Sequence, residues 1–168
     1  MADGITVDVN EKFDFIKAWL EAKCDEFCRR LAEVGLGVAS VSFADAPYDG
    51  VNDAVVMLEP IDNGYKITAF GRCVAFIEFG SGVHFNGSGS YKGDIPDGVV
   101  GIGQYGKGNG SRDYWLYKGH PGNAGGVLAN GKDDVTITHG NPASMPMYKA
   151  TKEITQDVID IAQEVFSV

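Results

Sequence analysis

Glycine is concentrated in one part of this chain, and that concentration constrains the fold more than any other feature. Of the 23 glycines in 168 residues, 16 lie between Gly80 and Gly131. Glycine costs backbone entropy in a helix or strand and offers no side chain to pack, so we expect a long loop here. The loop also carries aromatic side chains that a plain linker would not need: Phe85, Tyr91, Tyr105, Tyr114, Trp115 and Tyr117. We interpret it as an arm that packs against another molecule.

The residues before this segment predict one long helix followed by three strands. Apolar residues recur at spacings of three and four between Asn10, a good N-cap, and Gly35, which predicts a helix over residues 10–34. Runs of β-forming residues follow at 38–43, 54–61 and 65–70. The last two runs flank Asp62-Asn63-Gly64, a sequence typical of a hairpin turn.

The remaining elements complete an α+β pattern. Residues 73–79 are apolar and end at Gly80, which predicts a short helix with a glycine C-cap. Residues 134–138 alternate like a strand, and a last helix is predicted from Ser144 as N-cap, with Pro146 in its first turn. We therefore predict a single domain over residues 1–168, of class α+β. It would hold a mainly antiparallel sheet of about four strands, with the two long helices packed on one face and a glycine-rich loop at about 80–131.

Charge and composition argue against several classes of protein. The net charge of −9 disfavours tight binding to phosphate backbones, which needs clustered Lys and Arg. No run of apolar residues is long enough to span a membrane, and the first residues do not resemble a secretory signal, so we expect synthesis in the cytoplasm and no membrane partner. The three cysteines, Cys24, Cys28 and Cys73, form no disulfide framework, and we expect them to pack in the core.

Patterns that would support catalysis or cofactor binding are weak. The glycines at 101, 103 and 106 match a dinucleotide fingerprint in letters only, because no βα unit surrounds them. The histidines lack the close spacing of metal ligands on one helix, so we expect neither metal nor cofactor: they are His84, His120 and His139. For Glu78, capping or pairing across a subunit contact is favoured over acid–base chemistry. Two alternatives stay open, a small hydrolase using Glu78 and a histidine, and a carbohydrate-binding module using the loop aromatics.

Three segments, in this order along the chain, carry a recognisable pattern. Residues 74–82 read Val-Ala-Phe-Ile-Glu-Phe-Gly-Ser-Gly, residues 114–117 read Tyr-Trp-Leu-Tyr, and residues 138–148 read Thr-His-Gly-Asn-Pro-Ala-Ser-Met-Pro-Met-Tyr. Together they resemble a family of tail components of long-tailed double-stranded DNA phages, whose genes lie between the head and tail genes. The departures from the family pattern are Met145-Pro146-Met147, where a Pro-Phe pair is usual, a longer glycine-rich loop, and an N-terminal half without a matching motif.

The resemblance implies a structural virion protein at the head–tail junction rather than an enzyme. Members are described as neck, head–tail joining, tail-completion or minor tail proteins. The implied assembly is a closed ring of about six or twelve subunits around the DNA channel. The implied partners are other copies of the chain, the head-closure or connector protein, the tail tube or terminator protein, and passing double-stranded DNA bound without sequence specificity. Residues expected to contact another subunit or a neighbouring ring are Phe76, Glu78, Phe79, Tyr105, Tyr114, Trp115, Tyr117, Pro146 and Tyr148.

The acidic charge suggests a property of such a channel. DNA has to slide through the junction at ejection, and a basic lining would bind phosphates and retard it. We therefore expect some surplus carboxylates to face the channel, and the alternative is that they form a solvated outer surface. The candidates are Asp45, Asp49, Asp53, Asp94 and Asp97.

Overall fold

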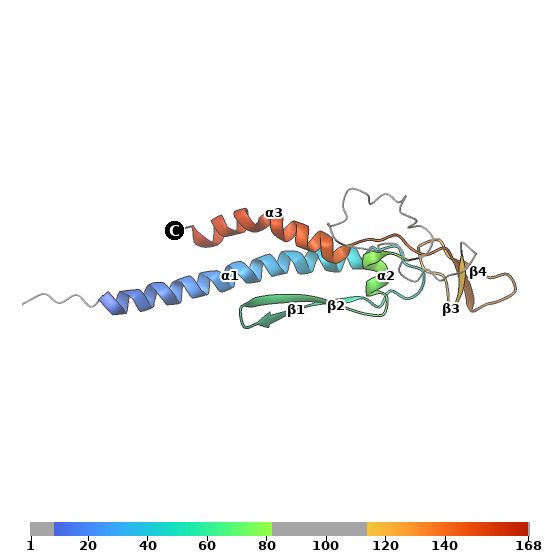
Figure 1. Ribbon diagram of the computed structural model, residues 1–168, viewed down its shortest axis with the longest axis horizontal. Helices are drawn as coiled ribbons and strands as arrows, with labels where there is room; N and C mark the ends of the chain where they lie inside the picture. Colours follow the sequence, from blue (N-terminus) through green and yellow to red (C-terminus); the bar gives the residue numbers. More distant parts are fainter. Residues whose placement is uncertain (1–8, 82–113, 168) are drawn as a thin grey trace, which may run out of the picture.

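The computed structural model describes residues 9–81 and 114–167, and it has α+β architecture (Figure 1). None of the described helices is apolar enough over sufficient length to cross a membrane. The helices are α1 (Val9–Ala44), α2 (Val74–Phe79) and α3 (Pro146–Phe166). The strands are β1 (Val55–Ile61), β2 (Gly64–Phe70), β3 (Trp115–Lys118), β4 (Val127–Leu128) and β5 (Val135–Thr138).

Helix α1 is ten residues longer at its C-terminal end than the sequence predicted. It continues through Gly35 to Ala44, so the strand predicted at residues 38–43 is wrong. Ala32, Ala39 and Phe43 are all buried, and their spacings of seven and four place them on one face of the helix. Burial of this face outweighs the β-forming tendency of the local sequence.

Gly35 does not end the helix, because it lies where three elements meet. A Cβ atom at this position would lie 2.5 Å from Cδ1 of Ile154 in α3 and 2.7 Å from Cδ1 of Ile67 in β2. Glycine therefore lets α3 and the hairpin both approach α1 closely. Gly37, one half-turn further, has no atom within 4 Å of the equivalent point.

These two glycines give a matched pair for a stability measurement. Gly37→Ala should raise the free energy of unfolding by about 0.5–1 kcal/mol, because alanine is the better helix former and nothing obstructs its methyl group. Gly35→Ala should lose that gain to the clash with the two isoleucines and come out lower than Gly37→Ala by about 1–3 kcal/mol. Urea denaturation of both variants tests this, and equal stabilisation by the two would contradict the packing role of Gly35.

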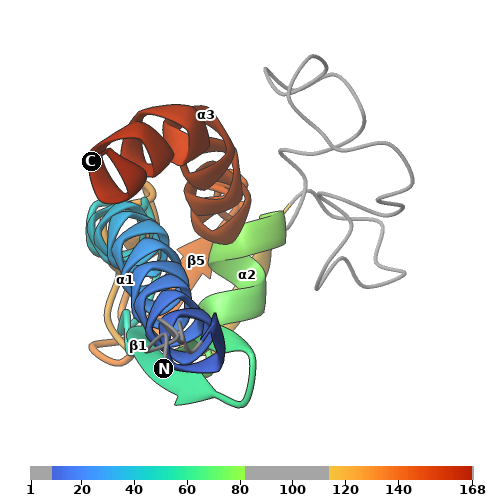
Figure 2. The same ribbon diagram turned by 90° about the vertical axis from the view of Figure 1, so that its left-hand side faces the viewer.

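The long helices and the hairpin form three layers, with α1 between α3 and the β1–β2 hairpin (Figures 1 and 2). Near the end of α3, the rings of Phe27 and Phe166 have centroids 5.8 Å apart. An ion pair between Arg30 and Glu164 joins the helices one turn further along. At the hairpin tip, the hydroxyl of Tyr65 donates to Asp25, with an O–O distance of 3.2 Å. The N-terminal end of α1 extends past both the end of α3 and the tip of the β1–β2 hairpin (Figure 1).

The strands form two separate sheets, so the prediction of one sheet of about four strands is wrong. One sheet is the β1–β2 hairpin, and the other has the order β3–β5–β4, with every pairing antiparallel. Residues 38–43 add no strand because they belong to α1. Strands β3 and β4 both lie inside the segment at about 80–131 that was predicted as loop.

Several predicted elements are confirmed. The hairpin pairs Ile61 with Gly64 around a two-residue loop, and Gly64 has a φ of 135°. Helix α2 ends at Gly80 with a φ of 74°, and β5 begins one residue later than predicted. A buried cluster joins the end of α1 to α2 and fixes the position of α2: Phe43, Ala46, Cys73 and Ile77. Cys73 is thus in the core as predicted, whereas Cys24 is exposed.

Candidate functional site

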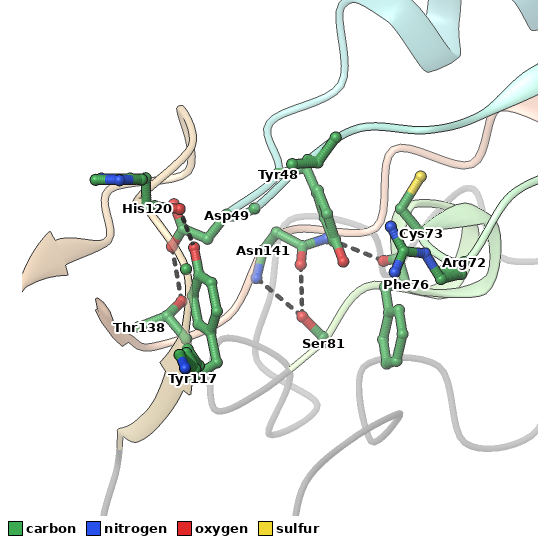
Figure 3. Close-up of a pocket in the computed structure, with 14 residues that line it drawn as sticks. Tyr48, Asp49, Arg72, Cys73, Phe76, Ser81, Tyr117, His120, Thr138 and Asn141 are labelled. Atoms are coloured by element: carbon green, nitrogen blue, oxygen red, sulfur yellow. Dashed lines mark hydrogen bonds between the residues drawn. The ribbon is translucent and has the colours of Figure 1, made fainter. Parts of the chain in front are cut away.

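Two segments of the predicted motif pattern, distant in sequence, are joined by buried hydrogen bonds. The hydroxyl of Ser81 donates to Oδ1 of Asn141 at 2.5 Å, and the Ser81 amide donates to the Asn141 carbonyl at 2.9 Å. Nδ2 of Asn141 donates to the carbonyl of Phe76 at 2.9 Å. The amide of Ser144 donates to the carbonyl of Ile77 at 2.8 Å. The end of α2 and the approach to α3 therefore form one polar framework, with Asn141 at its centre (Figure 3).

Glu78 caps α3 from outside that helix. Its buried carboxylate accepts the amide N–H of Met147 at 2.9 Å and that of Tyr148 at 3.2 Å. Such amides at a helix start have no partner within the helix, and the positive end of the helix dipole favours an anion there. Burial raises the pKa of Glu78 above its ordinary value, while these two hydrogen bonds and the charge of Lys149 act in the opposite direction.

The backbone before α3 explains why Glu78 is needed. The predicted N-cap, Ser144, is wrong: the cap position is Met145, whose side chain makes no capping hydrogen bond. Met145 has a φ of 51° and is the one non-glycine residue with positive φ among those described. Pro146 follows and has no N–H, so the amides of the next two residues are the first that need an acceptor.

Beside this framework lies an open pocket of about 510 Å³, bounded by the loop that follows α1, by α2 and by strands β3 and β5 (Figure 3). Asp49 organises its wall. The Asp49 carboxylate accepts the amides of Ala124 at 3.2 Å and Gly126 at 3.0 Å, and the hydroxyl of Thr138 at 2.7 Å. The other side chains that line the pocket include Tyr48, Arg72, Cys73, Tyr117, Lys118 and His120.

Several titratable groups in or next to this wall have shifted pKa values. Arg72 Nε donates to Asp53 at 2.9 Å, and this interaction, with a hydrogen bond from the amide of Cys73, holds the pKa of Asp53 well below its usual range. Burial raises the pKa of the Cys73 thiol and that of the Tyr48 phenol. A nucleophile needs the opposite shift, so at neutral pH these two groups are hydrogen-bond donors.

Most of the predicted contact residues gather around this framework. Glu78 and Pro146 are buried in it, Tyr148 lies beside it in α3, and Phe79 is partly exposed at the end of α2. Tyr117 lines the pocket and donates its hydroxyl to the carbonyl of His120 at 2.7 Å. The rings of Tyr114 and His139 have centroids 6.3 Å apart. Phe76 lines the pocket and Trp115 begins β3, while Tyr105 lies outside the described residues.

The candidate channel carboxylates differ from one another. Asp45 is exposed directly after α1, whereas the carboxylates of Asp49 and Asp53 are engaged by the internal hydrogen bonds given above. Asp94, Asp97 and His84 lie outside the described residues. Within residues 9–81 and 114–167, no group of three His, Cys, Asp or Glu side chains is arranged to hold a metal ion.

Sequence reasoning missed the two central hydrogen-bonding residues of this site. In the sequence, Asn141 stands out only as part of the segment 138–148, and Asp49 only as one of the surplus carboxylates. A local signal existed for Asp49, because Asp49-Gly50 is a sequence typical of a turn, and a carboxylate in a turn commonly accepts backbone amides. No comparable signal marked Asn141.

Comparison with protein-family models found no match to this chain. Comparisons with curated proteins and with solved structures found no similar protein either.

Proposed function

We propose that this protein is a structural subunit of the head–tail junction of a long-tailed DNA phage, acting in a ring that surrounds the DNA channel. The observation that carries the proposal is the framework between residues 74–81 and 138–148. These are two of the three segments that resemble the phage tail components, and their polar residues are used to join secondary-structure elements. That use fits a structural protein better than an enzyme.

The arrangement of Glu78 favours this proposal over a hydrolase. Both of its carboxylate oxygens accept backbone amides of α3, so they are directed at the helix. A general acid or base has to reach a substrate proton instead. Likewise, Ser81 lines the pocket, but its buried hydroxyl is hydrogen-bonded to Asn141 and has no base beside it in the described contacts.

The hydrogen bonds of the candidate carboxylates reduce the number that we propose to face the DNA channel. Asp49 and Asp53 hold backbone and side-chain groups of their own subunit, so their carboxylates are committed to the fold. Among the three described candidates, Asp45 is therefore the carboxylate that we propose to face the DNA. Repulsion from an acidic lining would keep the duplex centred over about 8 Å at physiological salt.

Cryo-electron microscopy of the phage particles that encode this chain tests the function. We expect a closed ring of this subunit between head and tail, and we expect a nonsense mutation in its gene to leave heads and tails unjoined. Absence of the chain from purified, infectious particles would refute the proposal. A ring at the tail tip would keep the structural class and refute the location.

A further inference from the structure

The N-terminal part of α1 has an apolar surface that nothing in the described subunit covers. Its residues 13–24, which we call the α1 overhang, precede Asp25 and Phe27, where α1 contacts the hairpin tip and α3. Figure 1 shows the N-terminal end of α1 extending past both of these elements. Five large apolar side chains of the overhang are between 40% and 73% exposed: Phe13, Phe15, Ile16, Trp19 and Leu20. At these exposures they leave on the order of 500 Å² of apolar surface in water.

This surface continues an interface that already exists. Phe13, Ile16 and Leu20 follow each other at spacings of three and four, and the same line reaches Phe27, which packs on Phe166 of α3. The stripe is thus covered by α3 in one half and bare in the other. A helix that extends alone into water is marginally stable, and an apolar patch this large marks an interaction site.

A second uncovered apolar surface lies on the hairpin. Side chains of β1 alternate between α1 and the opposite side, and the cross-strand pair Val55 and Phe70 belongs to the side turned away from α1. We call this side the hairpin outer face. Its large apolar residues are between 51% and 56% exposed: Val55, Met57, Ile61 and Phe70.

We infer that the α1 overhang of one copy of this chain packs on the hairpin outer face of the next copy. The inference rests on the proposed ring, because a contact between two different surfaces repeats from subunit to subunit and closes into a ring when the rotation allows. The inner face of the same hairpin already packs on α1 within one subunit. The neighbour's helix would cover the outer face, so that both faces of the two-stranded sheet would be covered.

Size and charge favour a second copy as the occupant. The overhang is about 18 Å long and each hairpin strand about 23 Å, so one can lie along the other. Copies with a net charge of −9 repel each other, and contact is cheapest where the local charge is balanced. The overhang has two acidic and two basic residues, a sum of zero, and the hairpin has two acidic and one basic, a sum of −1: Asp14, Lys17, Glu21 and Lys23, and Glu59, Asp62 and Lys66.

Two variants of the full chain, each blocking one surface, test the contact. The overhang variant carries Ile16→Glu and Leu20→Glu, and the hairpin variant carries Met57→Glu and Phe70→Glu. Sedimentation measures self-association across a concentration series, and circular dichroism checks that each variant is folded. Ile159→Glu is the control, because Ile159 is an exposed apolar residue on α3, outside both surfaces.

The wild type and the control should associate beyond dimers, and each blocked variant alone should be monomeric, with a dissociation constant raised at least about 30-fold. A mixture of the two variants retains one intact copy of each surface and should form one-to-one dimers. Self-association of the hairpin variant alone would overturn the inference in favour of an overhang-to-overhang pair. A monomeric mixture, or a wild type that stays monomeric throughout, would overturn it in favour of a different partner.

The inferred contact and the proposed function can be refuted independently of each other. If junction rings assemble from the blocked variants with unchanged efficiency, the inferred contact is refuted and the proposed function is not. Conversely, if the mixed variants form one-to-one dimers but the chain is absent from phage particles, the contact is supported and the proposed function is refuted.

Discussion

Glu78→Ala should lower the free energy of unfolding by about 2–4 kcal/mol and the thermal midpoint by roughly 5–12 °C. The substitution removes a buried acceptor from the amides of Met147 and Tyr148, and Pro146 before them offers no replacement. Thermal unfolding followed by circular dichroism measures the effect. A loss below about 0.5 kcal/mol would mean that water or another side chain caps α3 equally well.

Glu78→Gln provides the matched control, because it keeps an accepting oxygen and removes the titration. Burial raises the pKa of Glu78 in the folded protein, so the folded state binds this proton more tightly than the unfolded chain does. The contribution of Glu78 is therefore largest at low pH and declines as the pH rises from about 4.3 to the raised pKa. The free energy of unfolding of the wild type, relative to Glu78→Gln, should fall across this interval and then stay constant. A rise would show that the two hydrogen bonds outweigh burial.

Asp49→Ala should cost about 2–4 kcal/mol of unfolding free energy, because one carboxylate accepts three hydrogen bonds from two different segments. Besides this loss of global stability, we expect a local loss of protection around the amides that Asp49 binds. Hydrogen exchange at the amides of Ala124 and Gly126 should accelerate more than exchange in α1, since Asp49 ties this loop to β5. Uniform acceleration along the chain would instead indicate that Asp49 supports the whole fold.

Asp45→Ala is the control for that measurement. Asp45 is exposed and follows directly on the C-terminal end of α1, where the helix dipole disfavours a negative charge. The substitution should change the free energy of unfolding by less than about 0.5 kcal/mol, in the stabilising direction. Together the two variants distinguish a carboxylate that holds the fold from an exposed one, which our proposal places in the channel.

Elements defined by local chemistry were predictable from this sequence. The hairpin follows from Asp62-Asn63-Gly64 between two β-forming runs, and α2 follows from a short apolar run ended by Gly80. In both cases the decisive residue and the element it ends are neighbours in the chain. The hairpin and α2 were therefore placed to within a residue or two.

Elements decided by distant contacts were not predictable in the same way. Gly35 followed by β-forming residues has the sequence of a helix end, whereas inside the folded helix the Cδ1 atoms of Ile154 and Ile67 occupy the space beside Gly35 that a Cβ would take. Gly126 illustrates the same point, because a Cβ there would lie 2.7 Å from Oδ2 of Asp49. Glycine clustering predicted a loop, while part of the clustering reflects close approaches within a sheet region.

The candidate site was predictable in its residues more than in their roles. The sequence favours Glu78 as a capping residue or as one that pairs across a subunit contact, and the helix that it caps begins 68 residues later in the chain. The local pattern pointed to Ser144 instead, whose amide is used to bond the carbonyl of Ile77. Because the partner of a cap can come from anywhere in the chain, a pattern read along the sequence favours the nearest residue.

The separation between α1 and α3 has a consequence for how the chain folds as it is synthesised. Helix α3 begins 102 residues after α1 ends, so the ribosome completes α1 long before the helix that covers it exists. At about 5–20 residues per second this interval lasts roughly 5–20 seconds. During it, the hairpin is the one native partner of the α1 segment around Phe27 among the elements that the structure describes. Pairings of such high contact order form slowly, so nascent chains are exposed to aggregation in this window. Chaperone binding should therefore concentrate on the apolar stripe of α1 and end when α3 emerges.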